Sequence, residues 1–231
     1  QRADTASKTL AFGNAVRCGK CSFQNRKSKN LLALADKQIK VPNIFIIAGC
    51  NGAGKTTASF TILPEMLNCK EFVNADEIAK GLSPFQPESV SFQAGRIMLE
   101  RIDELLETGV DFAFETTLTT LSYVNTISLA KSKGYTINLL FFWLNDVNLA
   151  IERVKARVNE GGHNIPEETI RRRYFRGIVN LTSKFSEICD YWIVINNSSR
   201  PFTFVAEGQN DIVLKIHDEL VWQQIKNHSN E

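Results

Sequence analysis

From residue 41 onward, the chain alternates between short apolar runs and longer amphipathic segments. Short apolar runs are typical of buried strands, and apolar residues at three- and four-residue spacing are typical of helices that pack on a sheet. The pattern predicts strands at 44–48, 71–74, 111–115, 135–144, 192–196 and 202–206. Strands that alternate with helices indicate an α/β fold, a mostly parallel sheet with helices on both faces.

Two helical segments have clear boundaries. The first spans residues 87–108, ends at Gly109 and has its apolar positions at Ala94, Met98, Ile102, Leu105 and Leu106. The second follows Asp146, a residue type that caps helices, and runs to about residue 160. Gly161 and Gly162 interrupt it, and Pro166 opens a further helix. We therefore expect a helical excursion at about residues 146–177.

Length and composition favour one large globular domain. The chain has 231 residues, of which 43% are hydrophobic and 23% charged. These values exclude disordered and collagen-like classes, and no apolar run approaches the roughly 20 residues that span a bilayer. The five cysteines form no disulfide framework, which indicates reduced thiols in a cytoplasmic protein. Cys18 and Cys21 lack a second ligand pair at zinc spacing.

The basic residues are concentrated at the N-terminus. Residues 1–40 hold nine Lys or Arg and two Asp, whereas the rest of the chain holds 18 basic and 23 acidic residues. A basic arm can bind nucleic acid or acidic partners, but Lys and Ser among small residues more often form a solvated extension. We therefore predict a basic N-terminal extension over residues 1–40 and a folded domain over residues 41–231.

A phosphate-binding loop is predicted directly after the first strand. Its sequence is Gly49-Cys50-Asn51-Gly52-Ala53-Gly54-Lys55-Thr56, which fits the pattern G-x4-G-K-[ST] between a strand and a helix-compatible segment. The glycines let backbone N–H groups face phosphate oxygens, Lys55 reaches the β and γ phosphates, and Thr56 supplies a magnesium ligand. The loop and Thr57 therefore predict binding of ATP and Mg²⁺.

A carboxylate follows the second predicted strand, at Asp76. The carboxyl ends of parallel strands form the ligand crevice of an open α/β sheet, so Asp76 can act as a general base that orients an acceptor hydroxyl toward the γ-phosphate. The alternative is that Asp76 is only the N-cap of a helix that begins near Glu77. The position at the sheet edge favours the general base.

The third predicted strand ends in Glu115, Thr116 and Thr117. A carboxylate and two hydroxyls at the same sheet edge can bind a polyhydroxyl substrate or magnesium. The alternative is an ordinary strand end, because threonine favours strands and can cap a helix.

The helical excursion is rich in arginine. Its arginines are Arg153, Arg157, Arg171, Arg172, Arg173 and Arg176. Arginines four residues apart on one helix repel mildly unless an anion meets them, and a triphosphate would do so. A lid that brings guanidinium groups over the transferred phosphoryl group neutralises charge and excludes water. The alternative is a solvated charged face.

Together, these motifs resemble the zeta toxin family of P-loop kinases. The similarity spans about residues 42–208 and rests on the phosphate-binding loop, the segments 73–77 and 114–118, Ala94-Gly95-Arg96, the Gly161-Gly162-His163 turn and Arg171-Arg172-Arg173-Tyr174. The chain looks like the compact branch of the family. The resemblance implies a kinase that phosphorylates a hydroxyl of UDP-N-acetylglucosamine and is blocked by an antitoxin protein.

The resemblance also implies roles for particular residues. Lys55 and Thr56 would bind ATP and magnesium, and Asp76 would be the base. Glu115 and Thr117 would hold the sugar or its diphosphate, with Arg96 as a further candidate for the substrate phosphates. Arg157 and one arginine of 171–173, taken as Arg172, would clamp the phosphates of ATP. Thr119 stands where the longer toxins tend to have an arginine, which affects the acceptor and not the kinase chemistry.

Two other classes remain as alternatives. A P-loop ATPase or switch would need a strand-end carboxylate that positions water, for which Asp146 is the candidate. A nucleic-acid end kinase would need the N-terminal arm to contact phosphates. Neither alternative uses Glu115 and Thr117, so we favour a small-molecule kinase with a nucleotide sugar as acceptor. Nucleic acid and membrane partners are not expected.

Overall fold

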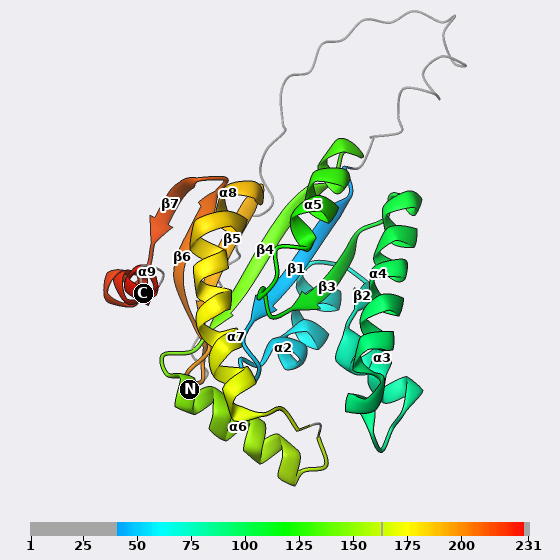
Figure 1. Cartoon of the computed structure of the whole chain (residues 1–231). Helices are drawn as coiled ribbons and strands as arrows, with labels where there is room; N and C mark the ends of the chain where they lie inside the picture. Colours follow the sequence, from blue (N-terminus) through cyan, green and yellow to red (C-terminus); the bar gives the residue numbers. More distant parts are fainter. Residues whose placement is uncertain (1–40, 163, 229–231) are drawn as a thin grey trace, which may run out of the picture. The chain divides into compact units, whose positions relative to one another are not determined.

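The computed structural model describes residues 41–162 and 164–228, and its centre is a seven-stranded sheet (Figure 1). The strands are β1 (Asn43–Gly49), β2 (Glu71–Val73), β3 (Phe112–Thr116), β4 (Thr136–Trp143), β5 (Tyr191–Asn196), β6 (Thr203–Gln209) and β7 (Ile212–Ile216). They are ordered β2-β3-β1-β4-β5-β6-β7; the first five strands are parallel, and the β5–β6 and β6–β7 pairings are antiparallel. The predicted extension at residues 1–40, with Cys18 and Cys21, lies outside the described residues.

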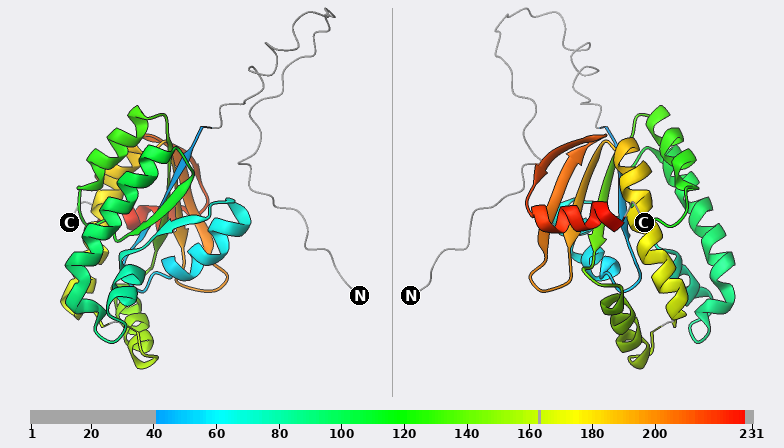
Figure 2. Two further views of the ribbon diagram at one scale, coloured as in Figure 1. Left: turned by 90° about the vertical axis from the view of Figure 1, so that its right-hand side faces the viewer. Right: turned by 60° about the vertical axis from the view of Figure 1, so that its left-hand side comes forward.

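Helices cover both faces of the sheet. They are α2 (Lys55–Thr61), α3 (Ala75–Leu82), α4 (Ser91–Thr108), α5 (Tyr123–Ser132), α6 (Val147–Asn159), α7 (Glu167–Asn180), α8 (Ser186–Ile188) and α9 (Glu219–His228), with a 3-10 turn at Pro87–Val90 and π-helical turns at Ile62–Met66 and Leu181–Phe185. Figure 2 shows α4, α5 and α7 on one face and α2 on the other. The predicted α/β class, with a mostly parallel sheet, is confirmed.

The burial of the central strands explains the apolar runs in the sequence. β1 is buried at every position except its first, and it lies between β3 and β4. A strand covered on both faces has no solvent side, so its sequence is continuously apolar and does not alternate. α4 buries the five apolar positions that its spacing predicts, and Gly109 ends it in the left-handed conformation with φ 68°.

Two elements at the far side of the sheet were not predicted. All five residues of β7 are exposed, so the strand has no alternation of buried and exposed positions to indicate it. α9 packs on the sheet through Trp222, whose ring stacks on Trp192 of β5 with 5.6 Å between centroids. Within the described part of the chain, no helix has the length and apolarity needed to cross a membrane.

The parallel strands all end at one edge of the sheet, the lower edge in Figure 1. α2 follows β1 there, α3 follows β2, and α6 follows β4. In open α/β sheets this edge forms the ligand crevice, because loops that diverge to opposite faces leave room between them. The predicted candidate residues at the ends of β1, β2 and β3 are therefore brought to the same edge.

Candidate active site

The loop after β1 has the backbone conformation that its glycines permit. Gly52 and Gly54 have φ angles of 78° and 81°. A Cβ on Gly52 would lie 2.6 Å from the carbonyl oxygen of Ala150, and one on Gly54 would lie 2.5 Å from Nδ2 of Asn197. Both conformation and space thus require glycine. Burial raises the pKa of the neighbouring Cys50 thiol to about 11, so this thiol is neutral near pH 7.

Glu115, at the end of β3, contacts the phosphate-binding loop. Thr56 Oγ1 donates a hydrogen bond to Glu115 Oε2 at 2.7 Å, and Lys55 Nζ lies 3.3 Å from Oε1. Lys55 Nζ also donates to the carbonyl oxygen of Cys50 at 3.0 Å. The side chains of Lys55 and Glu115 are only 6% and 10% exposed, so water screens their attraction weakly. The sequence predicted that these residues share an edge but not that they touch.

Asn74 connects this cluster to α3. Its Nδ2 donates to Glu115 Oε2 at 2.8 Å, while its Oδ1 accepts from the backbone N–H of Asp76 at 2.8 Å and of Glu77 at 3.4 Å. Asn74 is therefore the N-cap of α3, and the alternative that Asp76 is the cap is wrong. The sequence signal was available, because asparagine is a strong N-cap residue.

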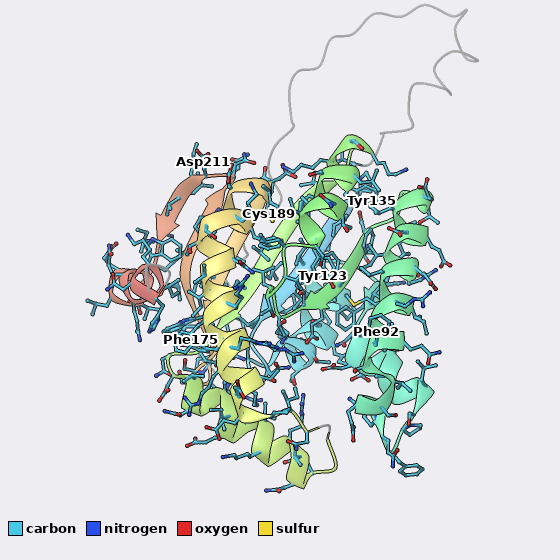
Figure 3. All side chains as sticks on the ribbon, viewed as in Figure 1. Phe92, Tyr123, Tyr135, Phe175, Cys189 and Asp211 are labelled. Carbon is cyan, nitrogen blue, oxygen red and sulfur yellow. The ribbon has the colours of Figure 1, made fainter. Side chains whose placement is uncertain are left out.

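Asp76 lies in the first turn of α3 and lines a small hollow of about 40 Å³. Ala75 and Ser91 line both this hollow and an adjoining groove of about 330 Å³. The groove runs between α4 and the start of α5, and its lining includes Phe92, Arg96, Ser122 and Tyr123. Phe92 and Tyr123 are labelled in Figure 3. A volume of this size is at the lower end of the range for small-molecule sites.

Arg173 is the arginine of the triplet that reaches the phosphate-binding loop. Its Nη1 donates to Oδ1 of Asn51 at 3.0 Å. Burial lowers the pKa of Arg173, and the nearby charge of Asp76 acts in the opposite direction. Arg172 is exposed, and Arg171 donates instead to Glu167 and Asn148. The geometry therefore favours Arg173 over the predicted Arg172 as the arginine that faces the loop.

Arg153 has a structural contact that the sequence did not predict. It donates to the carbonyl oxygens of Asn197 and Ser198, each at 2.9 Å, and reaches that of Gly52 at 3.5 Å. Asn197 in turn donates to the carbonyl oxygen of Ala53 at 2.7 Å. These bonds hold α6, the loop after β5 and the phosphate-binding loop together. Arg157 lies one turn further along α6 and is half-buried.

The remaining predicted residues are Arg96, Thr117 and Asp146. Arg96 is exposed on α4, at the groove. Thr117 is half-buried, and its hydroxyl is hydrogen-bonded to that of Thr119. Asp146 is exposed and accepts a hydrogen bond from the backbone N–H of Asn148 at 2.8 Å, so it caps α6 as predicted. This contact argues against Asp146 as the water-positioning carboxylate of an ATPase.

The strand order and the loop geometry define the class of P-loop nucleotide-binding folds. Within that class the chain belongs to the zeta toxin family, because the family model described as Zeta toxin matches residues 29–201. An uncharacterized protein of Haemophilus influenzae is 31% identical over 127 residues, which make up 54% of this chain and 88% of that protein.

Chains of two solved structures have a similar fold. A chain of the AvrRxo1-ORF1:-ORF2 complex with ATP has a TM-score of 0.63 and 15% identity, and the match covers 80% of this chain and 63% of that chain. A chain of the PezAT toxin–antitoxin system of Streptococcus pneumoniae has a TM-score of 0.57 and 18% identity, covering 88% and 93%. At these identities the likeness shows the fold alone.

Proposed function

We propose that this protein transfers the γ-phosphate of ATP to a hydroxyl of a nucleotide sugar. The observation that carries this proposal is the position of Asp76. Asn74 links the start of α3 to Glu115 beside the phosphate-binding loop, and the charge of Asp76 acts on Arg173. On its other side, Asp76 lines the hollow that adjoins the groove beside α4. A general base is needed between a nucleotide and an acceptor, and Asp76 is available there.

The nucleotide side of the proposed site is built from the phosphate-binding loop and the arginine-rich excursion. Lys55 would bind the β and γ phosphates, as the predicted loop implies, with residues 49–57 supplying backbone N–H groups. Arg173 and Arg157 would meet the charge that develops on the transferred phosphoryl group. The complex of the structurally similar AvrRxo1 proteins with ATP supports ATP as the donor.

The donor set near Thr56 fits magnesium. The Thr56 hydroxyl and the Glu115 carboxylate are neighbouring oxygen donors, and Mg²⁺ is typically held by one or two such groups together with substrate phosphates. A bound Mg²⁺ would supply charge neutralisation at the phosphates.

In the transfer step, the acceptor hydroxyl attacks the γ-phosphorus in line with the bond to the leaving ADP. Asp76 orients the hydroxyl and accepts its proton, and Lys55 and Arg173 offset the negative charge on the phosphoryl oxygens. The excursion over residues 146–177 would exclude water, which otherwise competes with the acceptor. Of the groups that the step requires, this chain thus provides the base at Asp76 and positive charges at Lys55 and Arg173.

The groove suits an acceptor that has a ring and an anionic group. Phe92 offers an aromatic face and Arg96, one turn later on the same helix, offers a guanidinium. Thr117, directly after β3, would bind sugar hydroxyls. Glu115 would accept hydrogen bonds from the sugar with the lone pairs that Lys55, Thr56 and Asn74 do not use. The family resemblance points to UDP-N-acetylglucosamine, and the similar fold of the PezAT system supports a toxin that is paired with an antitoxin.

The test is transfer of labelled γ-phosphate from ATP to a panel of acceptors. The panel contains UDP-N-acetylglucosamine, free N-acetylglucosamine, UDP and a DNA oligonucleotide with a 5′-hydroxyl. We expect kcat/KM for the nucleotide sugar to exceed that for the free sugar by roughly tenfold to a hundredfold, because the free sugar lacks the anionic group that Arg96 would bind. Equal transfer to the free sugar, or faster transfer to the oligonucleotide, would remove the nucleotide sugar from the proposal.

Asp76→Asn tests the base. We expect nearly unchanged ATP binding and a loss of transfer of roughly 10²-fold or more, the usual scale of general-base catalysis. Asp103→Asn, the same change at an exposed position of α4, is the matched control and should retain activity. If Asp76→Asn kept full activity, Asp76 would not be the base.

A further inference from the structure

The Glu115 carboxylate lies between the Lys55 ammonium and the Thr56 hydroxyl. In the parallel register of β1 and β3, Glu115 pairs with Ile47, two residues before the first residue of the phosphate-binding loop. Its side chain therefore lies under the loop, where Oε1 is 3.3 Å from the Lys55 ammonium and Oε2 is 2.7 Å from the Thr56 hydroxyl. Asn74 holds the same Oε2 at 2.8 Å, which fixes the orientation of the carboxylate.

The ammonium that contacts Glu115 is the one that a nucleotide requires. A bound triphosphate and the Glu115 carboxylate would compete for the Lys55 ammonium. Because the side chains of Lys55 and Glu115 are almost fully buried, the repulsion between the carboxylate and the phosphates would be only weakly screened by water. Metal-free ATP therefore meets a penalty from Glu115. The penalty ends when a second cation takes the place of Lys55 beside the carboxylate.

Thr56 indicates where that cation would bind. Its hydroxyl donates its proton to Glu115, so its lone pairs remain free to coordinate a metal. An oriented carboxylate next to a hydroxyl is a donor set for a hard divalent cation that also binds phosphate oxygens.

We propose that Glu115 makes ATP binding depend on a divalent cation: it retains Lys55 until a cation binds beside Thr56 and frees the ammonium for the phosphates. This inference rests on one part of the proposed function, the binding of ATP at the phosphate-binding loop, and does not depend on the acceptor. It assigns Glu115 to the nucleotide and metal side of the site, whereas the family resemblance implies a role in holding the acceptor.

The experiment measures the Kd of ATP by calorimetry in EDTA and in excess Mg²⁺, without any acceptor. In the unaltered protein we expect Mg²⁺ to tighten binding strongly. In Glu115→Gln we expect metal-free ATP to bind about tenfold more tightly than in the unaltered protein, and the gain from Mg²⁺ to fall at least tenfold. Titration with Mn²⁺, followed by its electron paramagnetic resonance signal in the presence of ADP, should show weaker metal binding in the same variant.

Two further variants keep the test decisive. Glu115→Asp keeps the charge and should retain most of the dependence on Mg²⁺, which separates charge from folding. Asp146→Asn removes a carboxylate at an exposed helix cap, where asparagine caps equally well, and should behave as the unaltered protein. If Glu115→Gln keeps weak metal-free binding and a full response to Mg²⁺, the inference is wrong, even if transfer to an acceptor is observed. If ATP binds under neither condition, both the inference and the proposed function fail.

Discussion

Arg171, Arg172 and Arg173 are adjacent in sequence but reach different partners. Successive residues of an α-helix point about 100° apart, so only one of three consecutive side chains can face the phosphate-binding loop. Here that residue is Arg173, which donates to Asn51, while Arg171 pairs with Glu167 on its own helix. The sequence established that this helix carries guanidinium groups and could not establish which one faces the phosphate-binding loop.

Arg173→Ala should lower kcat for phosphoryl transfer by about 10²-fold or more, with a smaller effect on KM for ATP. A guanidinium that meets developing charge acts mainly on the transition state. Arg172→Ala removes the same group from the exposed neighbouring position and should change kcat less than about threefold. Steady-state kinetics of the two purified variants check this expectation. A larger loss in Arg172→Ala would restore Arg172 as the lid arginine.

At the scale of elements, close packing of α7 sets the position of Arg173. A Cβ on Gly177 would lie 2.8 Å from the carbonyl oxygen of Thr117, just after β3. Asn180, one turn later, donates to the carbonyl oxygen of Leu118 at 2.7 Å. The loop after β3 and the arginine-bearing helix therefore lie against each other, and both contacts are made to backbone carbonyl oxygens of the loop.

Gly177→Ala should destabilise the protein although alanine favours helices. The clash with a backbone oxygen should outweigh the gain in helix propensity and leave a net loss of about 1–2 kcal/mol, or roughly 2–8 °C in Tm. Activity should also fall, because α7 must move and Arg173 moves with it.

Gly81→Ala is the matched control on α3, since a Cβ there meets nothing within 4 Å. This variant should raise the free energy of unfolding by about 0.5–1 kcal/mol. Thermal unfolding of the two variants side by side measures both effects. An equal rise in Tm for both would show that α7 can move away from Thr117 without cost.

At the scale of the whole molecule, the site depends on which strands are neighbours. Thr56 and Glu115 are 59 residues apart in sequence and meet only because β3 lies directly beside β1 in the sheet. β2 lies on the other side of β3, which brings Asn74 to the same carboxylate. The order of strands thus assembles the Lys55, Thr56, Glu115 and Asn74 cluster.

Removing residues 1–28 should leave Tm, ATP binding and transfer unchanged. These residues precede both the family match, which begins at residue 29, and the compact unit that begins at Val41. None of the predicted phosphate-handling residues lies there. A second deletion, of residues 1–36, enters the matched region and maps the boundary. Loss of activity at unchanged Tm in the shorter deletion would mean that the N-terminal residues contribute to the site.

Local patterns in the sequence were sufficient for the elements that lie in the core. The apolar run of β1, the spacing along α4 and the cap at Asp146 are each encoded within a few residues, and the structure confirms all three. The phosphate-binding loop is equally local, because its glycines must adopt left-handed backbone angles that few other residues tolerate. β7 could not be predicted in this way, because all of its residues are exposed and its sequence therefore shows no alternation of apolar and polar positions.

The sequence by itself determined the class of fold, the glycine-rich loop predicted to bind phosphate and the supply of carboxylates and arginines. Only the tertiary structure decided that Glu115 lies against Lys55 and Thr56, and that Arg173 faces Asn51. The physical reason is that these contacts join residues that are far apart in the sequence. A backbone angle or an apolar stripe depends on near neighbours, whereas the partner of a buried charge depends on strand order and helix rotation, which the whole core sets together.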